Sequence, residues 1–135
     1  MHEMGEPKIK IVAMPKDTNA AGNIFGGWIM SQMDIAGSLA ARELSPDRVV
    51  TVAVNSMSFK KPVYVGDAVC CYAKIVKVGN SSIQTEIEVV AERANLGKIE
   101  RISVTSAVIT YVSVDKDGVK KPIVLTNNQK KLYDR

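Results

Sequence analysis

The chain has 135 residues, of which 46% are hydrophobic and 24% are charged, and its formal net charge is +4. This length and balance predict one soluble globular domain with a single core and argue against a disordered or fibrous protein. The longest apolar runs fall far short of the roughly 18 residues of a membrane span, and the start MHEMGEPKIK has no signal-peptide pattern, so we expect a cytoplasmic protein without membrane insertion.

The predicted elements are a short strand, one long helix and then several long strands. Alternation in residues 8–13 predicts the first strand, and the turn-forming residues of 16–26 predict a structured loop. The helix runs from about Gly27 to Leu44, because Ser45-Pro46-Asp47 ends it. Four β-branched runs follow, separated by turn-forming segments: RVVTVAVNSMSF, DAVCCYAKIVKV, SSIQTEIEVVAER and ERISVTSAVITYVSV.

The strands predict an antiparallel sheet with one packed face. Apolar and polar residues alternate over 83–90, so we expect one side of that strand to be packed and the other to be largely exposed to solvent. The polar tail NNQKKLYDR is expected to fray. We predict a single α+β domain over residues 1–135, with its core at about 8–122 and a tail at 123–135, in which the helix packs on one face of about five strands.

One histidine and two adjacent cysteines limit the chemistry that is available. Cys70 and Cys71 point to opposite faces of a strand, and neither has the spacing of a zinc site or of a redox pair. We expect no metal and no cofactor, so catalysis must use carboxylates, amides, hydroxyls and backbone groups. Aromatic residues make up 5% of the chain and no stacking motif is visible, so nucleic acid is not an expected partner.

The helix carries Asp34 among apolar residues. At about 100° per residue, the small or polar residues form one stripe with Asp34, and Ile29, Met33, Ala36 and Ala40 lie opposite. We expect a helix that is buried around most of its circumference, with Asp34 on a partly buried polar seam. The pattern alone allows equally a solvent-facing acid or one that is paired with Arg42 or a lysine.

Gly26 and Gly27 at the helix start favour a catalytic role for this acid. Unpaired N–H groups and the positive end of the helix dipole attract negative charge, and glycine lets a ligand approach, so a carbonyl oxygen could be held there as it becomes an oxyanion. An ordinary glycine-rich loop entry is the alternative. Asp34 lies about 10–12 Å farther along the axis, so an antiparallel helix of a second protomer would supply the acid. Asn23 could orient a water or the substrate, or serve only in a turn.

The string DTNAAGNIFGGWIMSQMDIAG, followed by RVVTVAVNSMSFKKPVYVGDAVCCYAKIVKVGNSSI, closely resembles the hot-dog-fold acyl-CoA thioesterases. The subfamily it resembles is the small bacterial single-domain one of broad specificity, and the resemblance runs from about Ile9 to about Pro122. It implies one long central helix wrapped by a five- to six-stranded antiparallel sheet. It also implies a homo-oligomer whose functional unit is a dimer with antiparallel helices, and dimers that assemble into a hexamer.

The resemblance further implies which residues form the site. The catalytic acid falls on Asp34, the amide before Phe-Gly-Gly falls on Asn23, and the backbone of Gly26 and Gly27 matches the oxyanion-binding helix start. A turn that lies near CoA in relatives matches Ser81 and Ser82, although a hairpin turn would use the same residues for shape alone. CoA phosphates need cationic groups, for which Lys60, Lys61 and Arg93 are candidates, against the alternative of solvated surface.

The implied reaction is hydrolysis of acyl-CoA to CoA and a carboxylic acid. Asp34 would act as a general base on water or attack the carbonyl itself, and the sequence does not choose between the two. One alternative is a hot-dog hydratase or dehydratase, which typically pairs an aspartate with a histidine. Another is a module that binds or senses acyl-CoA, which Asp34 argues against because an acid is a poor choice beside a polyanion.

Overall fold

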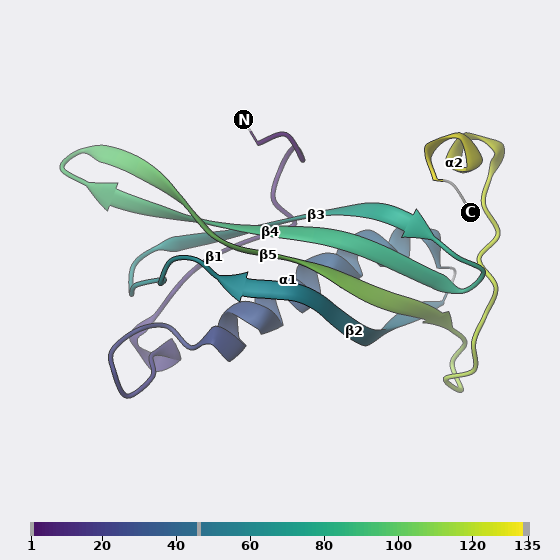
Figure 1. Ribbon diagram of the computed structural model, residues 1–135, viewed down its shortest axis with the longest axis horizontal. Helices are drawn as coiled ribbons and strands as arrows, with labels where there is room; N and C mark the ends of the chain where they lie inside the picture. Colours follow the sequence, from purple (N-terminus) through teal and green to yellow (C-terminus); the bar gives the residue numbers. More distant parts are fainter. Residues whose placement is uncertain (1, 46, 134–135) are drawn as a thin grey trace.

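The computed structural model describes residues 2–45 and 47–133. A helix, α1, runs along one face of a five-stranded sheet (Figure 1). The strand order is β1-β3-β4-β5-β2, and every neighbouring pair is antiparallel. The elements are β1 (Ile9–Val12), α1 (Gly26–Ala41), β2 (Arg48–Phe59), β3 (Ala68–Val78), β4 (Ser82–Asn95), β5 (Lys98–Val114) and α2 (Asn127–Leu132), with 3-10 turns at Pro15–Asp17 and Arg42–Leu44.

The core lies between α1 and the inner face of the sheet. Ile83, Thr85, Ile87 and Val89 of β4 are all fully buried on this face, as predicted. The opposite face is less exposed than expected, since Gln84, Glu86 and Glu88 are half-buried and Val90 is buried. On α1 the predicted apolar stripe is also confirmed, since Ile29, Met33, Ala36 and Ala40 are all buried in the same core. The α+β architecture and the four long β-strands therefore follow the sequence prediction.

Two expectations about the ends of elements need correction. The helix ends at Ala41 and continues as a 3-10 turn to Leu44; Pro46, one of the residues expected to end it, lies outside the described residues. The tail beyond residue 122 was expected to lie outside the core and its polar part NNQKKLYDR was expected to fray, but Ile123 and Leu125 are buried in the core and residues 127–132 form α2. Thr126 then caps α2, because its hydroxyl accepts a hydrogen bond from the Gln129 N–H group at 3.2 Å. Residues 134 and 135 of the tail lie outside the described part.

The expectation that α1 is buried around most of its circumference is wrong for the single chain. Met30 and Ile35 are 41% and 49% exposed. Met30 lies on the side of α1 toward β2, where it lines one pocket with Thr51 and Val54, whereas Ile35 lies about 140° away around the helix. Within the described residues β2 has a neighbouring strand on one side only. Three valines of β2 are exposed as well. We call the exposed side chains on this side the apolar edge: Met30, Val50, Val52 and Val54.

Candidate active site

Asp34 sits in the middle of α1, and two hydroxyl groups from the sheet hold its carboxylate. The Thr51 hydroxyl donates to Asp34 Oδ1 at 2.7 Å, and the Tyr111 hydroxyl lies 3.0 Å from the same oxygen. The Tyr111 oxygen also lies 2.7 Å from the main-chain carbonyl oxygen of Asp34, so its single hydrogen is shared between these two acceptors. Because β2 and β5 pair Thr51 directly opposite Tyr111, the sheet delivers both hydroxyls to one turn of the helix.

The surroundings of Asp34 are those of a polar seam that borders the core. Asp34 itself is half-buried, as predicted, whereas Tyr111 is fully buried. Burial raises the pKa of the Tyr111 hydroxyl far above its usual range, and the charge and hydrogen bond of Asp34 raise it further. Tyr111 is therefore a neutral hydrogen-bond donor at any physiological pH. No ion pair joins Asp34 to Arg42 or to a lysine in the part of the chain that is described.

A pocket of ≈ 240 Å³ opens beside Asp34 and reaches the start of the helix. Its wall includes Gly27, Ser31 and the apolar side chains of Met30, Val54 and Met57. A Cβ added at Gly27 would meet nothing within 4 Å, and the backbone there is ordinary helix, so the packing of this chain does not require a glycine. No side chain among the described residues caps the first turn. The N–H groups of that turn therefore face a space that a ligand or a second protomer could enter.

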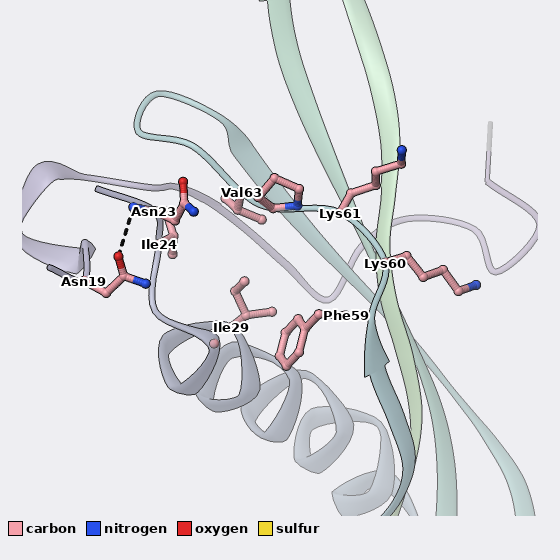
Figure 2. Close-up of a pocket in the computed structure, with 10 residues that line it drawn as sticks. Asn19, Asn23, Ile24, Ile29, Phe59, Lys60, Lys61 and Val63 are labelled. Carbon is pink, nitrogen blue, oxygen red and sulfur yellow. Dashed lines mark hydrogen bonds between the residues drawn. The ribbon is translucent and has the colours of Figure 1, made fainter. Parts of the chain in front are cut away.

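A second pocket, of ≈ 360 Å³, lies on the other side of the helix start (Figure 2). It gathers Asn23, Gly26, Lys60 and Lys61, four of the residues that the sequence singles out. The ammonium groups of both lysines extend away from the helix in Figure 2. The Asn19 side chain shapes this loop, because its Oδ1 accepts hydrogen bonds from the N–H groups of Ala21 and Asn23 at 2.9 and 3.1 Å.

Arg93 lies outside both pockets and has a partner within the chain. Its Nε and Nη2 donate to the two carboxylate oxygens of Asp67 at 2.9 and 2.8 Å. The guanidinium also lies over the Tyr64 ring, 4.5 Å from the centroid. Because Asp67 is only 2% exposed, removing Arg93 would leave a buried charge unpaired. This bidentate ion pair therefore stabilises the chain itself, and a role of Arg93 in binding CoA stays a prediction.

Ser81 and Ser82 form the turn between β3 and β4, at the end of the sheet opposite to the start of α1 (Figure 1). The Ser82 carbonyl accepts from the Gly79 N–H at 2.8 Å and closes the hairpin, and the Ser81 carbonyl accepts from Ser113 at 2.8 Å. The single chain thus brings Asp34 and Gly27 to one pocket and Asn23 and Gly26 to another. It leaves both serines far from either pocket, and their substrate-binding role stays a prediction.

Sequence reasoning missed the two hydroxyl donors. Thr51 and Tyr111 lie in β-branched runs, where threonine and tyrosine are common strand formers. One signal could have indicated Tyr111: its position shares the inward face with Ile109 and Ala107, so its hydroxyl must find a partner within the core. The identity of that partner depends on where the helix crosses the sheet, which the strand pattern does not contain.

Known proteins share the sequence and the fold of this chain. The family model of the thioesterase superfamily matches residues 21–98. The acyl-CoA thioester hydrolase YciA of Salmonella typhimurium is 51% identical over 120 residues, which cover 88% of this chain and 90% of that protein. The chain therefore belongs to the thioesterase superfamily, as its sequence predicts.

Two solved structures are similar over nearly the whole chain. A hexameric hotdog fold thioesterase of Campylobacter jejuni is 56% identical with a TM-score of 0.91, and the match covers 99% of this chain and 100% of that one. A hexameric broad specificity acyl-coenzyme A thioesterase, solved as a variant in which one aspartate is replaced by alanine, is 51% identical with a TM-score of 0.86 over 93% and 91% of the two chains. The predicted hot-dog fold is confirmed.

Proposed function

We propose that this protein hydrolyses acyl-CoA thioesters to free CoA and a carboxylic acid. The observation that carries this function is the Asp34 carboxylate, held by Thr51 and Tyr111 beside a pocket that reaches the bare helix start at Gly27. Two relatives that are each 51% identical support the same substrate class: one is an acyl-CoA thioester hydrolase and the other is a broad specificity acyl-coenzyme A thioesterase.

In this proposal the N–H groups of the first turn of α1 polarise the thioester carbonyl. In one route Asp34 takes a proton from the attacking water and passes it to the sulfur, so that CoA leaves as the thiol. In the other, Asp34 adds to the carbonyl carbon, CoA leaves as the thiolate, and water then hydrolyses the acyl-enzyme anhydride to the carboxylic acid and the free Asp34 carboxylate. A carboxylate, two hydroxyls and backbone N–H groups suffice for these steps, so the proposal includes no metal and no cofactor. Hydrolysis in ¹⁸O-labelled water separates the two routes, because an acyl-enzyme intermediate places label in Asp34 under single-turnover conditions.

The functional unit in this proposal is a dimer with two composite sites. Gly27 and Asp34 of one chain line the same pocket, but within one helix they lie about 10–12 Å apart along the axis, too far for Asp34 to act on a carbonyl held at its own helix start. In this proposal the helix start that holds the carbonyl therefore belongs to one protomer and the acting Asp34 to the other. The apolar edge supports this arrangement, because exposed apolar side chains along a strand that lacks a neighbour on one side are typical of a protein interface. Since both similar solved structures are hexameric, we extend the proposal to a hexamer built from three such dimers.

The CoA phosphates are proposed to lie near Lys60 and Lys61. These lysines line the same pocket as Asn23 and Gly26, and their ammonium groups extend away from the helix (Figure 2), so a phosphate bound by them would lie on the side of this pocket away from the helix. Asp67 already pairs with Arg93, which makes that guanidinium the weaker candidate. The serine turn would contribute only if another protomer brings it to this pocket.

None of the described helices is long and apolar enough to span a membrane. We propose the cytoplasm as the compartment, and the two free thiols Cys70 and Cys71 support this, because thiols persist in a reducing environment.

The test is release of free thiol from acyl-CoAs of several chain lengths, measured for the native protein and for Asp34→Asn. The proposal expects turnover by the native protein and none by the variant, with acyl-CoA binding retained. Binding of acyl-CoA by the native protein without thiol release would indicate a binding or sensing module. Water addition to an enoyl-CoA without thiol release would indicate a hydratase; the one histidine, His2, instead stacks on Tyr72 on the outer face of the sheet.

A further inference from the structure

The two oxygens of the Asp34 carboxylate have different surroundings. Thr51 and Tyr111 both direct their hydroxyls at Oδ1, whereas no residue of the described chain donates to Oδ2. We propose that Tyr111 is a positioning residue: its hydroxyl anchors Oδ1 and so presents Oδ2 to the reacting water or carbonyl. This inference rests on the proposed thioesterase function and adds to it the group that orients the catalytic acid.

The Tyr111 hydroxyl is fixed in place by its surroundings. The side chain is fully buried among core residues of β4 and β5, so its ring has no freedom to swing. Its oxygen lies 2.7 Å from the main-chain carbonyl oxygen of Asp34 and 3.0 Å from Oδ1. Two contacts to one residue, one of them to the helix backbone, set the side chain of Asp34 relative to its own helix. Thr51, on the exposed edge strand β2, is the less constrained donor.

Gly37 makes this close approach possible. A Cβ at position 37 would lie 2.3 Å from the Tyr111 hydroxyl oxygen, which is much closer than real Cβ atoms come to other atoms. The helix therefore lacks a side chain at the one place where the hydroxyl passes to reach Asp34, one turn earlier. A glycine inside a helix and a hydroxyl buried in the core each lower stability. Orientation of the Asp34 carboxylate is a functional reason for placing both here.

Orientation of a catalytic group has a large effect on rate. An aspartate in a half-open pocket can rotate about both side-chain torsions, and a misplacement of about 1 Å can lower the rate about 100-fold. Burial and the Asp34 charge raise the pKa of Tyr111, so the phenol stays a donor throughout the pH range of an assay and does not itself exchange protons.

The experiment compares Tyr111→Phe with the native protein by steady-state kinetics. The change keeps the ring and removes one oxygen. We expect kcat to fall roughly 10- to 100-fold and KM to stay within about two-fold, because the ring touches no substrate group. The matched control is Tyr72→Phe: this tyrosine is also buried, and its hydroxyl accepts from Arg101 at 2.7 Å on the outer face of the sheet. Its kinetics should not change.

The outcomes separate this inference from the function on which it rests. If Asp34→Asn is inactive but Tyr111→Phe keeps the native kcat, the positioning role is overturned and the thioesterase function stands. If Asp34→Asn keeps its activity, or the native protein releases no thiol, the proposed function fails and this inference fails with it. Should Tyr111→Phe fail to fold, Gly37→Ala decides instead, because it retains the hydroxyl but displaces it; a native kcat in that variant would refute the role.

Discussion

The contact between Gly37 and Tyr111 allows a quantitative test of how α1 meets the sheet. In Gly37→Ala the new methyl group would lie 2.3 Å from the tyrosine oxygen and 3.0 Å from both Ile87 Cδ1 and Thr85 Oγ1. The last two contacts need shifts of only a few tenths of an ångström. The first cannot relax so easily, because the tyrosine is fully buried and its hydroxyl is bonded to Asp34.

Two terms of opposite sign determine the size of the effect. Overpacking of a tight core costs about 1–3 kcal/mol, while replacing glycine by alanine inside a helix stabilises it by about 1 kcal/mol. We therefore expect Gly37→Ala to lower the free energy of unfolding by up to about 2 kcal/mol. In a Tyr111→Phe background the 2.3 Å contact is gone, so the same alanine should cost much less or even stabilise. The coupling energy between the two changes should reach about 1 kcal/mol or more.

The assay is urea unfolding of the native protein, the two single variants and the double variant at one fixed protein concentration, because the stability of an oligomer depends on concentration. Gly27→Ala is the matched control on the same helix, since its added methyl meets nothing within 4 Å and should not lower stability. If the effects of Gly37→Ala and Tyr111→Phe add within about 0.5 kcal/mol, the hydroxyl does not occupy the space beside residue 37 and the geometry argued above is wrong.

The remaining predictions concern activity, assembly and reactivity. Asp34→Asn should abolish thiol release yet leave the fold and the oligomer intact, which circular dichroism and gel filtration check; loss of assembly would point to a structural role instead. Chains with Asp34→Asn, mixed with chains inactivated by Gly27→Val, should regain activity in hybrid dimers, and no recovery despite proven subunit exchange would place acid and oxyanion site in one chain. Lys60→Ala with Lys61→Ala should raise KM for acyl-CoA, leave kcat nearly unchanged and weaken the salt dependence of binding; initial rates at two salt concentrations decide this. Because burial raises the pKa of Cys71 to about 12, a thiol reagent at pH 8 should modify it only after unfolding, and rapid labelling of the native protein would contradict that burial.

The sequence by itself determined the type and order of the main elements. The alternation in residues 83–90 and the apolar stripe of the helix each depend on residues that are close in the chain, so their periods indicate strand and helix directly. It also singled out Asp34, because an acid within an apolar helix conflicts with its local surroundings. The continuous motif from Asp17 onward was sufficient to indicate the family.

Only the tertiary structure decided what each of these elements touches. The Tyr111 hydroxyl reaches Asp34 across 77 residues of sequence, and Arg93 forms its ion pair with Asp67 across 26. The tail beyond residue 122 adds to the core because Ile123 and Leu125 find a place there. Such contacts depend on the register of strand pairing, including a shift between Thr51 and Ala53 in β2, and on where the helix crosses the sheet. Both are set by packing of the whole chain, so no local pattern in the sequence encodes them.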